Sequence, residues 1–311
     1  MMKYFLTLIL VIATLIATAC SPSNDNGTGA NGDTGTLILK LTDAPVDSEN
    51  LTGVYIAINE IMVNKSTSDD TNWTTVREYD EPLVYNLLEL TNGNFALLGE
   101  FELTAGQYNQ IRFLLEIQEH GNGSPTTPGS YVEFSDETTE SLFVPSGGQT
   151  GYKAVGAFEV PVNGEVEVTV DFNLRKALNV TGQGNNQRYI LKPTLRLIVD
   201  SQSGNINGTI TLETTYTNIV IFAYENGDWD ISEVEDPLEG ESRFPNAVTS
   251  SKMSGEGTYV LAYLAYGTYD LVLAGYNDEI FGGVLGVVSD VILDSNHTIV
   301  NVDNDNLEPI P

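Results

Sequence analysis

Three oxygen-bearing side chains stand at alternate positions in one acidic segment of the chain. They are Asn226, Asp228 and Asp230. Carboxylate and amide oxygens at alternate positions are typical of calcium-binding loops. The segment has neither the glycine that such loops carry at the sixth position nor the glutamate at the twelfth. We therefore predict a solvated acidic loop here and no metal site, with calcium binding by these three residues as the alternative.

Basic side chains gather between positions 175 and 196, where they could bind an anion or an acidic glycan. They are Arg175, Lys176, Arg188, Lys192 and Arg196. The chain has 43 acidic residues against 13 lysines and arginines, so we expect these cations to pair with neighbouring carboxylates instead. Arg112 and Arg196 lie within apolar stretches, and each is expected to form a structural salt bridge.

Residues for nucleophilic or metal-assisted catalysis are scarce. The two histidines, His120 and His297, are far apart in sequence, and neither has a serine or cysteine partner suggested by its surroundings. The motifs of common hydrolases, zinc proteases and phosphate-binding loops do not occur in the sequence. We therefore predict that the protein is not an enzyme and holds no cofactor. A catalytic carboxylate pair is the alternative, although no pair stands out among so many acids.

The net charge of −30 bears on the partners that the protein can have. A polyanion repels phosphate backbones, so nucleic acid is not expected to bind. The 15 tyrosines and two tryptophans could stack on sugar rings, although tyrosine often fills the faces of strands. A protein or a glycan therefore stays open as a partner.

Cys20 is the only cysteine, and it follows a segment with the features of a secretory signal. Lys3 is followed by an apolar run at residues 5–16, and the small residues at 17–19 precede the cysteine. Cysteine directly after Ala-Thr-Ala resembles the lipobox of bacterial lipoproteins. The resemblance implies cleavage after residue 19, acylation of Cys20 and anchoring in a lipid membrane. Ser21 in place of aspartate implies the outer membrane, and ordinary signal cleavage with an incidental cysteine is the alternative.

Residues 20–35 are expected to form a flexible linker. The sequence after this linker has the pattern that is typical of β-strands. Valine and phenylalanine alternate with polar residues over 165–172, which predicts a strand with one buried and one wet face. No long stretch has a helical period, and one turn of helix is expected at 86–90. We predict an all-β fold with two tandem antiparallel β-sandwich domains, Ig-like or transthyretin-like, at 36–200 and 201–304, and a tail at 305–311.

Short blocks keep a fixed order over residues 34–199. They are LTDAPVD at 41–47, LTAGQYNQIR at 103–112, VPSG at 144–147, DFNLRK at 171–176 and LKP at 191–193. Together they resemble the bacterial domain-of-unknown-function family 4382, which has no assigned chemistry. The resemblance implies a β-sandwich in the cell envelope and supplies no catalytic residues.

Residues 204–304 are similar to the carboxypeptidase regulatory-like domain, a transthyretin-type sandwich. The similarity rests on INGTI at 206–210, GTYVL at 257–261 and YGTYDL at 266–271. Gly257 and Gly267 lie just before expected strands, as turn glycines do. Such modules are commonly spacers or contact surfaces.

Together these features predict a non-enzymatic lipoprotein of the outer membrane that acts as a display, structural or interaction module. A carbohydrate-binding or adhesive surface lipoprotein is the alternative, and it predicts a strip of exposed aromatic side chains. A hydrolase would instead need a deep pocket with converging carboxylates.

Overall fold

The computed structural model describes residues 33–44, 51–67, 71–117, 129–145, 150–182, 187–237, 242–278 and 280–310. Residues 33–311 form one compact unit in which strands dominate. Cys20, His120 and the predicted signal segment lie outside the described residues. The predicted all-β fold is confirmed.

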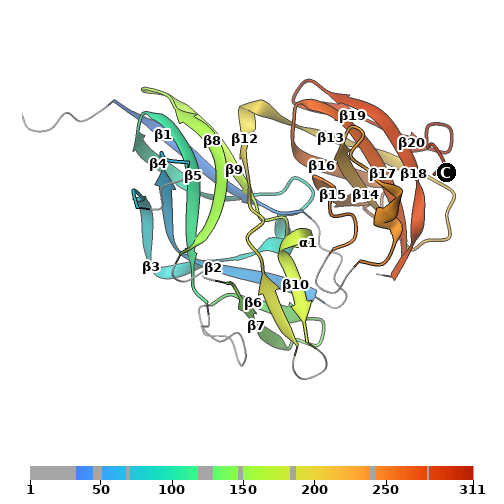
Figure 1. Cartoon of the computed structure of the whole chain (residues 1–311), viewed down its shortest axis with the longest axis horizontal. Coiled ribbons are helices and arrows are strands. Elements are labelled where there is room, and N and C mark those ends of the chain that lie inside the picture. The colour runs from blue at the N-terminus through green and yellow to red at the C-terminus, as the bar shows by residue number, and fades with distance from the viewer. Residues whose placement is uncertain are drawn as a thin grey trace, which may run out of the picture. The chain divides into compact units, whose positions relative to one another are not determined.

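Within the described ranges, the first part of the chain forms one sheet of twelve strands, blue to yellow in Figure 1. The order is β10-β11-β7-β6-β2-β5-β8-β12-β9-β1-β4, and β3 pairs with β2. The strands are β1 (Thr34–Thr42), β2 (Leu51–Asn64), β3 (Thr74–Asn86), β4 (Ala96–Thr104), β5 (Gly106–Leu115), β6 (Tyr131–Phe134), β7 (Thr139–Phe143), β8 (Tyr152–Val160), β9 (Glu165–Asp171), β10 (Leu178–Thr181), β11 (Arg188–Leu191) and β12 (Arg196–Val199).

Alternation along the strands builds the core of this first part. Successive side chains of a strand point to opposite faces, so Leu37, Leu39 and Leu41 of β1 share one face, and all three are fully buried. Strands from nearly the whole length of the sheet contribute to the same apolar cluster, which means that the sheet wraps around it.

The pairing is mixed, whereas the sequence predicts antiparallel sheets. Most neighbours are antiparallel, but β1 runs parallel to β9, β7 to β11 and β8 to β12. A hairpin joins only antiparallel strands, and these three pairs join strands that are distant in sequence. The alternating pattern of a single strand predicts which face is buried and does not specify the direction of a distant partner.

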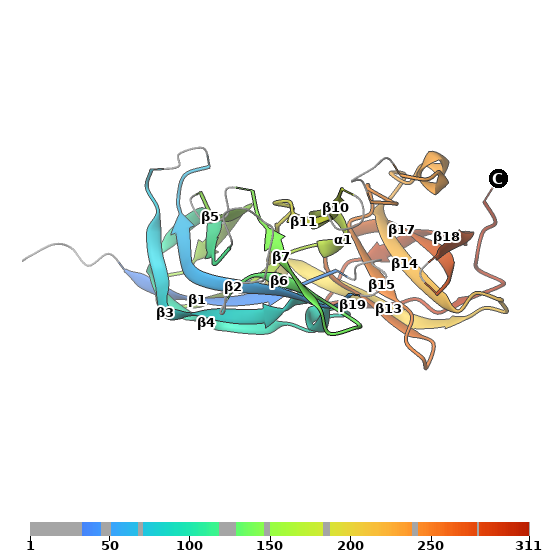
Figure 2. The ribbon, with the colours of Figure 1, turned by 90° about the horizontal axis from the view of Figure 1, so that it is seen from below.

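In the described residues after 202, two sheets of four strands each pack against each other, shown from yellow through orange to red in Figures 1 and 2. One has the order β16-β13-β19 with β20 beside β13, and the other has the order β15-β14-β17-β18. The strands are β13 (Ser203–Thr211), β14 (Asn218–Glu225), β15 (Thr249–Lys252), β16 (Thr258–Ala265), β17 (Gly267–Asn277), β18 (Ile280–Leu293), β19 (His297–Ile299) and β20 (Val302–Asp303). β13 runs parallel to both β19 and β20.

Strand β14 is buried on both faces. Ile219 and Ile221 belong to the cluster between the two sheets, while Val220 and Phe222 belong to a second cluster on the outer face. Phe244 and Ala247 come from a loop segment that covers this outer face. The near-continuous apolar run of β14 is what a strand covered on both sides requires.

In the part of the chain that the structure describes, helical structure is limited to short turns. They are η1 (Leu87–Leu90), α1 (Leu174–Ala177), η3 (Asp200–Gln202) and η4 (Ile231–Val234). The helical turn expected at 86–90 is confirmed by η1, and Asn86 caps it by accepting a hydrogen bond from the Leu88 amide. The apolar run at 189–199 forms two strands, β11 and β12, with Pro193 between them.

Candidate functional site

Strands β1, β9 and β12 lie side by side and present a row of polar side chains on one face. We call this the polar face and define it by Lys40, Thr42, Glu167, Thr169, Asp171 and Arg196. In the register of the strands, Asp171 of β9 lies between Thr42 of β1 and Arg196 of β12. The opposite face carries Val168 and Val170 into the core, so the alternation predicted for β9 is confirmed.

Only part of the polar face is wet. Glu165 and Glu167 are exposed, whereas Thr169 and Asp171 are 0% and 2% exposed. The small cavity beside Asp171 is also lined by Thr249 and Ser250 of β15 and by Tyr263 of β16, which accounts for the burial. The pattern of one strand does not reveal that residues 80 positions later cover half of its polar side.

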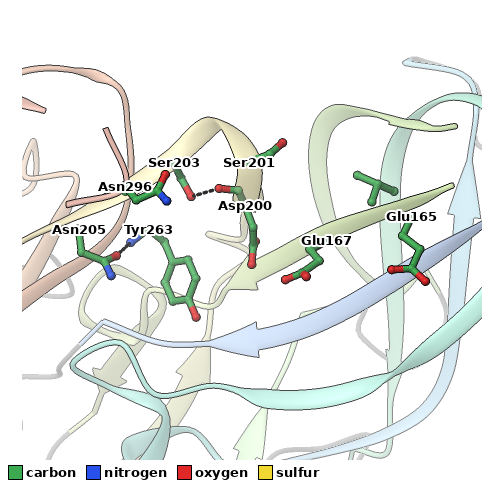
Figure 3. Close-up of a pocket in the computed structure, with 10 residues that line it drawn as sticks. Glu165, Glu167, Asp200, Ser201, Ser203, Asn205, Tyr263 and Asn296 are labelled. Atoms are coloured by element: carbon green, nitrogen blue, oxygen red, sulfur yellow. Dashed lines mark hydrogen bonds between the residues drawn. The ribbon is translucent and has the colours of Figure 1, made fainter. Parts of the chain in front are cut away.

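The wet end of the polar face borders an open hollow of about 540 Å³ (Figure 3). That volume lies within the range typical of small-ligand sites. Its lining residues are Glu165, Val166, Glu167, Asp200, Ser201, Ser203, Gly204, Asn205, Tyr263 and Asn296. The lining offers carboxylate, amide and hydroxyl groups, which together can accept and donate hydrogen bonds.

Lys40 holds two of the carboxylates at the hollow in place. Its Nζ donates to Glu167 and, over 3.0 Å, to Asp200 Oδ2. Burial acts to lower the pKa of Lys40, but the hydrogen bonds to these carboxylates outweigh it and raise the pKa above its usual value. Thr169 Oγ1 also donates to Asp200, over 2.7 Å. The acidic wall of the hollow is therefore a fixed network.

Tyr263 reaches the hollow from a strained position in β16. Its φ of 55° is in the left-handed region, which costs an L-residue about 1–2 kcal/mol. The backbone amide of Tyr263 donates to Asn205 Oδ1 over 3.1 Å, where the register of β13 and β16 shifts. Figure 3 shows Tyr263 near Asn205, with Asp200 between its ring and Glu167. A bulge of this kind re-aims a side chain.

Two exposed aromatic rings lie outside the lining of the hollow but are linked to it, Phe95 through Lys40 and Tyr266 through Asn296. Phe95 is 48% exposed, and its ring centroid lies 4.8 Å from Lys40 Nζ. Tyr266 is 42% exposed, and its hydroxyl lies 3.3 Å from Asn296 Oδ1. We call Phe95, Tyr263 and Tyr266 the aromatic rim. The sequence pattern does not predict this grouping, because Phe95 is far in sequence from the two tyrosines.

The covered end of the polar face contains two carboxyl groups close together. Asp171 accepts hydrogen bonds from Arg196, at 2.8 Å to Nη2, and from the amide of Asn173 at 2.9 Å. Asp43 Oδ1 accepts from the next amide, that of Leu174, over 2.8 Å. The salt bridge predicted for Arg196 is confirmed.

The five basic residues singled out in the sequence have different surroundings. Arg175 is buried and donates to the backbone oxygens of Arg243, Phe244 and Ala247 over 2.8, 2.8 and 3.2 Å. Lys192 Nζ donates to Asn179 Oδ1, and Arg188 is exposed. Burial, with Arg175 and Arg196 nearby, lowers the pKa of Lys176 to about 8. Outside this group, Arg112 stacks 4.2 Å from the Trp73 ring centroid.

The segment considered for calcium holds its polar groups in local hydrogen bonds. Asn226 donates its amide nitrogen to Asp270 and Asp290, and Asp230 accepts from the Ser232 amide as the N-cap of η4. The hydrogen bonds from Ser232 lower the pKa of the exposed Asp230. Asp228 is exposed. Within the described ranges, no three histidine, cysteine or acidic side chains gather as metal ligands.

His297 lies exposed on β19. None of the helices in the described ranges has the length and apolar character needed to cross a bilayer.

Comparison with known proteins identifies the family of the first part. The family model described as a domain of unknown function, DUF4382, matches residues 34–193. The chain belongs to the DUF4382 family. This confirms the resemblance seen in the sequence, and the DUF4382 match ends just before β12. The resemblance of residues 204–304 to a carboxypeptidase regulatory-like domain stays a prediction. No curated protein matches the sequence.

Solved structures offer weak similarities. A putative carbohydrate-binding protein from Pseudomonas aeruginosa is 15% identical, with 34% of this chain and 92% of that one covered and a TM-score of 0.21. The TIE protein of Bacillus anthracis is 13% identical, with 87% of this chain but only 33% of that one covered and a TM-score of 0.21. A minor pilin of Streptococcus agalactiae is 13% identical, with 89% and 98% covered and a TM-score of 0.20.

Proposed function

We propose that this member of the DUF4382 family is a non-enzymatic lipoprotein of the bacterial envelope, anchored in the outer membrane through an acylated Cys20. Its β-folded unit at 33–311 acts as an interaction module that presents the hollow and its rim. The fixed ion pairs at the open hollow support the interaction role. Lys40 holds the carboxylates of Glu167 and Asp200 in place, which suits a preformed contact surface.

The anchor is tested by replacing Cys20 in the full-length chain. Without the thiol no acyl chain can be attached, so the Cys20→Ala protein should leave the membrane fraction and appear in the soluble fraction. Ser21→Ala keeps the cysteine and serves as the matched control, which should remain with the membranes. A Cys20→Ala protein that partitions like the unaltered chain would refute the anchor.

A second candidate function is carbohydrate binding, and the aromatic rim favours it. Sugar rings stack on exposed aromatic faces, while their hydroxyls bond to carboxylates and amides such as those of Asp200 and Asn296. The acidic wall repels anions, so the ligand class is a neutral sugar.

Binding of the full chain to an array of neutral and acidic glycans tests this second candidate. Phe95→Ala and Tyr266→Ala should each weaken binding about tenfold, because each removes a stacking surface. Ile292→Ala alters a side chain that is 62% exposed and belongs neither to the aromatic rim nor to the lining of the hollow, so it should bind normally. Equal binding by all variants, or a preference for acidic glycans, would argue against a sugar site at the hollow.

A further inference from the structure

A buried carboxyl group lies at the covered end of the polar face with one oxygen unused. Asp43 is 6% exposed, and its Oδ2 has no hydrogen-bond partner in the described part of the chain. Ser250 on β15 is 3% exposed, and its hydroxyl also has no hydrogen-bond partner among the described residues. A buried polar atom without a partner costs about 1–3 kcal/mol, so two in one place require an explanation.

Both groups line the same small chamber. Its volume is about 10 Å³, close to the space of one water molecule. Asp43 reaches it from the end of β1, and Ser250 reaches it from β15, a strand of the other part of the molecule. The chamber therefore lies where residues before 200 meet residues after 202.

In the described part of the chain, none of the ion pairs involves Asp43. Asp171 is close enough to repel it, and Asp171 already pairs with Arg196. Arg175 and Lys176 belong to α1, and the Arg175 guanidinium donates to backbone oxygens of the loop at 243–247. Tyr152 and Tyr263 are the other titratable groups nearby, and the side facing the chamber from β15 offers the hydroxyls of Thr249 and Ser250.

We propose that Asp43 is a neutral carboxylic acid in the folded protein. Its proton lies on Oδ2 and is donated into the chamber that Asp43 shares with Ser250. Loss of this proton loosens β15 from the polar face. An acid O–H supplies the donor that Ser250 Oγ or one enclosed water can accept. An ionised Asp43 would instead place two carboxylates beside a single arginine in a space that water cannot solvate.

The direction of the resulting pH dependence follows from linkage. Burial and the charge of Asp171 raise the pKa of Asp43 well above its ordinary value. Between the unfolded pKa of about 3.9 and the raised folded pKa, the folded state binds one more proton than the unfolded state. The folding equilibrium constant should therefore fall about tenfold per pH unit in that range. This stabilisation is complete below about pH 4 and is lost as the pH rises through the folded pKa.

The experiment compares the full chain with its Asp43→Asn variant by urea unfolding between pH 5 and pH 8. The asparagine is neutral at every pH and can donate into the chamber, so it should fold and should gain stability relative to the unaltered chain as the pH rises. Asp200→Asn is the matched control on the same face, because it removes a carboxylate that pairs with Lys40. Its stability relative to the unaltered chain should stay constant over this range.

Two further measurements test whether Asp43 carries a proton and whether that proton affects the packing of β15 on the polar face. Infrared spectra at neutral pH should contain a protonated carboxylic acid band that Asp43→Asn removes and Asp200→Asn keeps. Amide hydrogen exchange in β15 should speed up with pH in the unaltered chain beyond the intrinsic increase, and not in Asp43→Asn. A constant stability difference for Asp43→Asn, an unfolded Asp43→Asn protein, or the same infrared spectrum in both would overturn the proposal.

Discussion

Arg175 shows how this strongly acidic chain uses a buried cation to hold backbone oxygens of a distant loop. Its guanidinium donates to three backbone oxygens between positions 243 and 247, and it lies 5.4 Å from the Phe222 ring centroid. The planar fork of arginine offers five donors in a fixed geometry, whereas lysine offers three donors on a flexible stem. The loop that covers the outer face of β14 is thus fixed by a residue from the other part of the molecule.

Replacing Arg175 by methionine should lower the free energy of unfolding by about 3 kcal/mol or more, because several buried carbonyls lose their donor. Arg175→Lys keeps the charge and should recover only part of the loss. Urea unfolding of the full chain measures both. Arg188→Met, at an exposed position, should change stability by less than about 0.5 kcal/mol. Equal effects of the changes at 175 and 188 would contradict this reading.

The roles of individual charged residues were only partly predictable from sequence. The salt bridge of Arg196 followed from a cation inside an apolar strand. The buried state of Asp43 did not, because nothing local distinguishes it from the exposed acids of the chain. Its environment depends on β15, more than 200 residues later. The aromatic rim was missed for the same reason.

At the scale of elements, β13 depends on a close approach that only glycine permits. A Cβ at Gly208 would lie 1.9 Å from the backbone oxygen of Val300, just after β19. Backbone atoms cannot move aside as a flexible side chain can. The parallel pairing of β13 with β19 and β20 is therefore built around this glycine.

Gly208→Ala should destabilise the protein by about 2–3 kcal/mol, because the added methyl group forces the two backbones apart. Gly255→Ala is the matched control, since a Cβ there meets no atom within 4 Å. Thermal unfolding of both variants checks the prediction. A Gly208→Ala protein that melts with Gly255→Ala would show that the strands can separate at little cost.

Strand positions were predictable where alternation was regular, as in β9. Strand partners were less so. Residues 189–199 are one apolar stretch of the sequence, yet β11 pairs with β7 and β10 while β12 pairs with β8 and β9. Alternation specifies the buried face of a strand, while the partner depends on how the whole sheet closes.

At the scale of the whole molecule, separate apolar clusters are joined by polar contacts. One cluster belongs to the twelve-stranded sheet, and two belong to the sheets after residue 202. Besides the Arg175 contacts, Asn173 donates to the Val248 oxygen over 3.4 Å, and Ser251 donates to Asn92 over 3.0 Å. The predicted boundary at residue 200 is therefore crossed by buried hydrogen bonds.

We expect the full chain to unfold in a single calorimetric transition near neutral pH, because the buried contacts couple its clusters. Arg175→Met should broaden or split that transition, while Arg188→Met should leave it single. Two well-separated transitions in the unaltered chain would mean that the parts unfold independently.

The position of β1 has a mechanical consequence if the chain is held by lipid at Cys20. β1 is the first described strand, and it lies between β4 and β9, with which it is paired along most of its length. Tension entering at the start of the chain would run along β1 and shear both rows of hydrogen bonds at once, instead of peeling them apart one by one. Such a tethered protein would resist drag or pulling because the hydrogen bonds on both sides of β1 share the load.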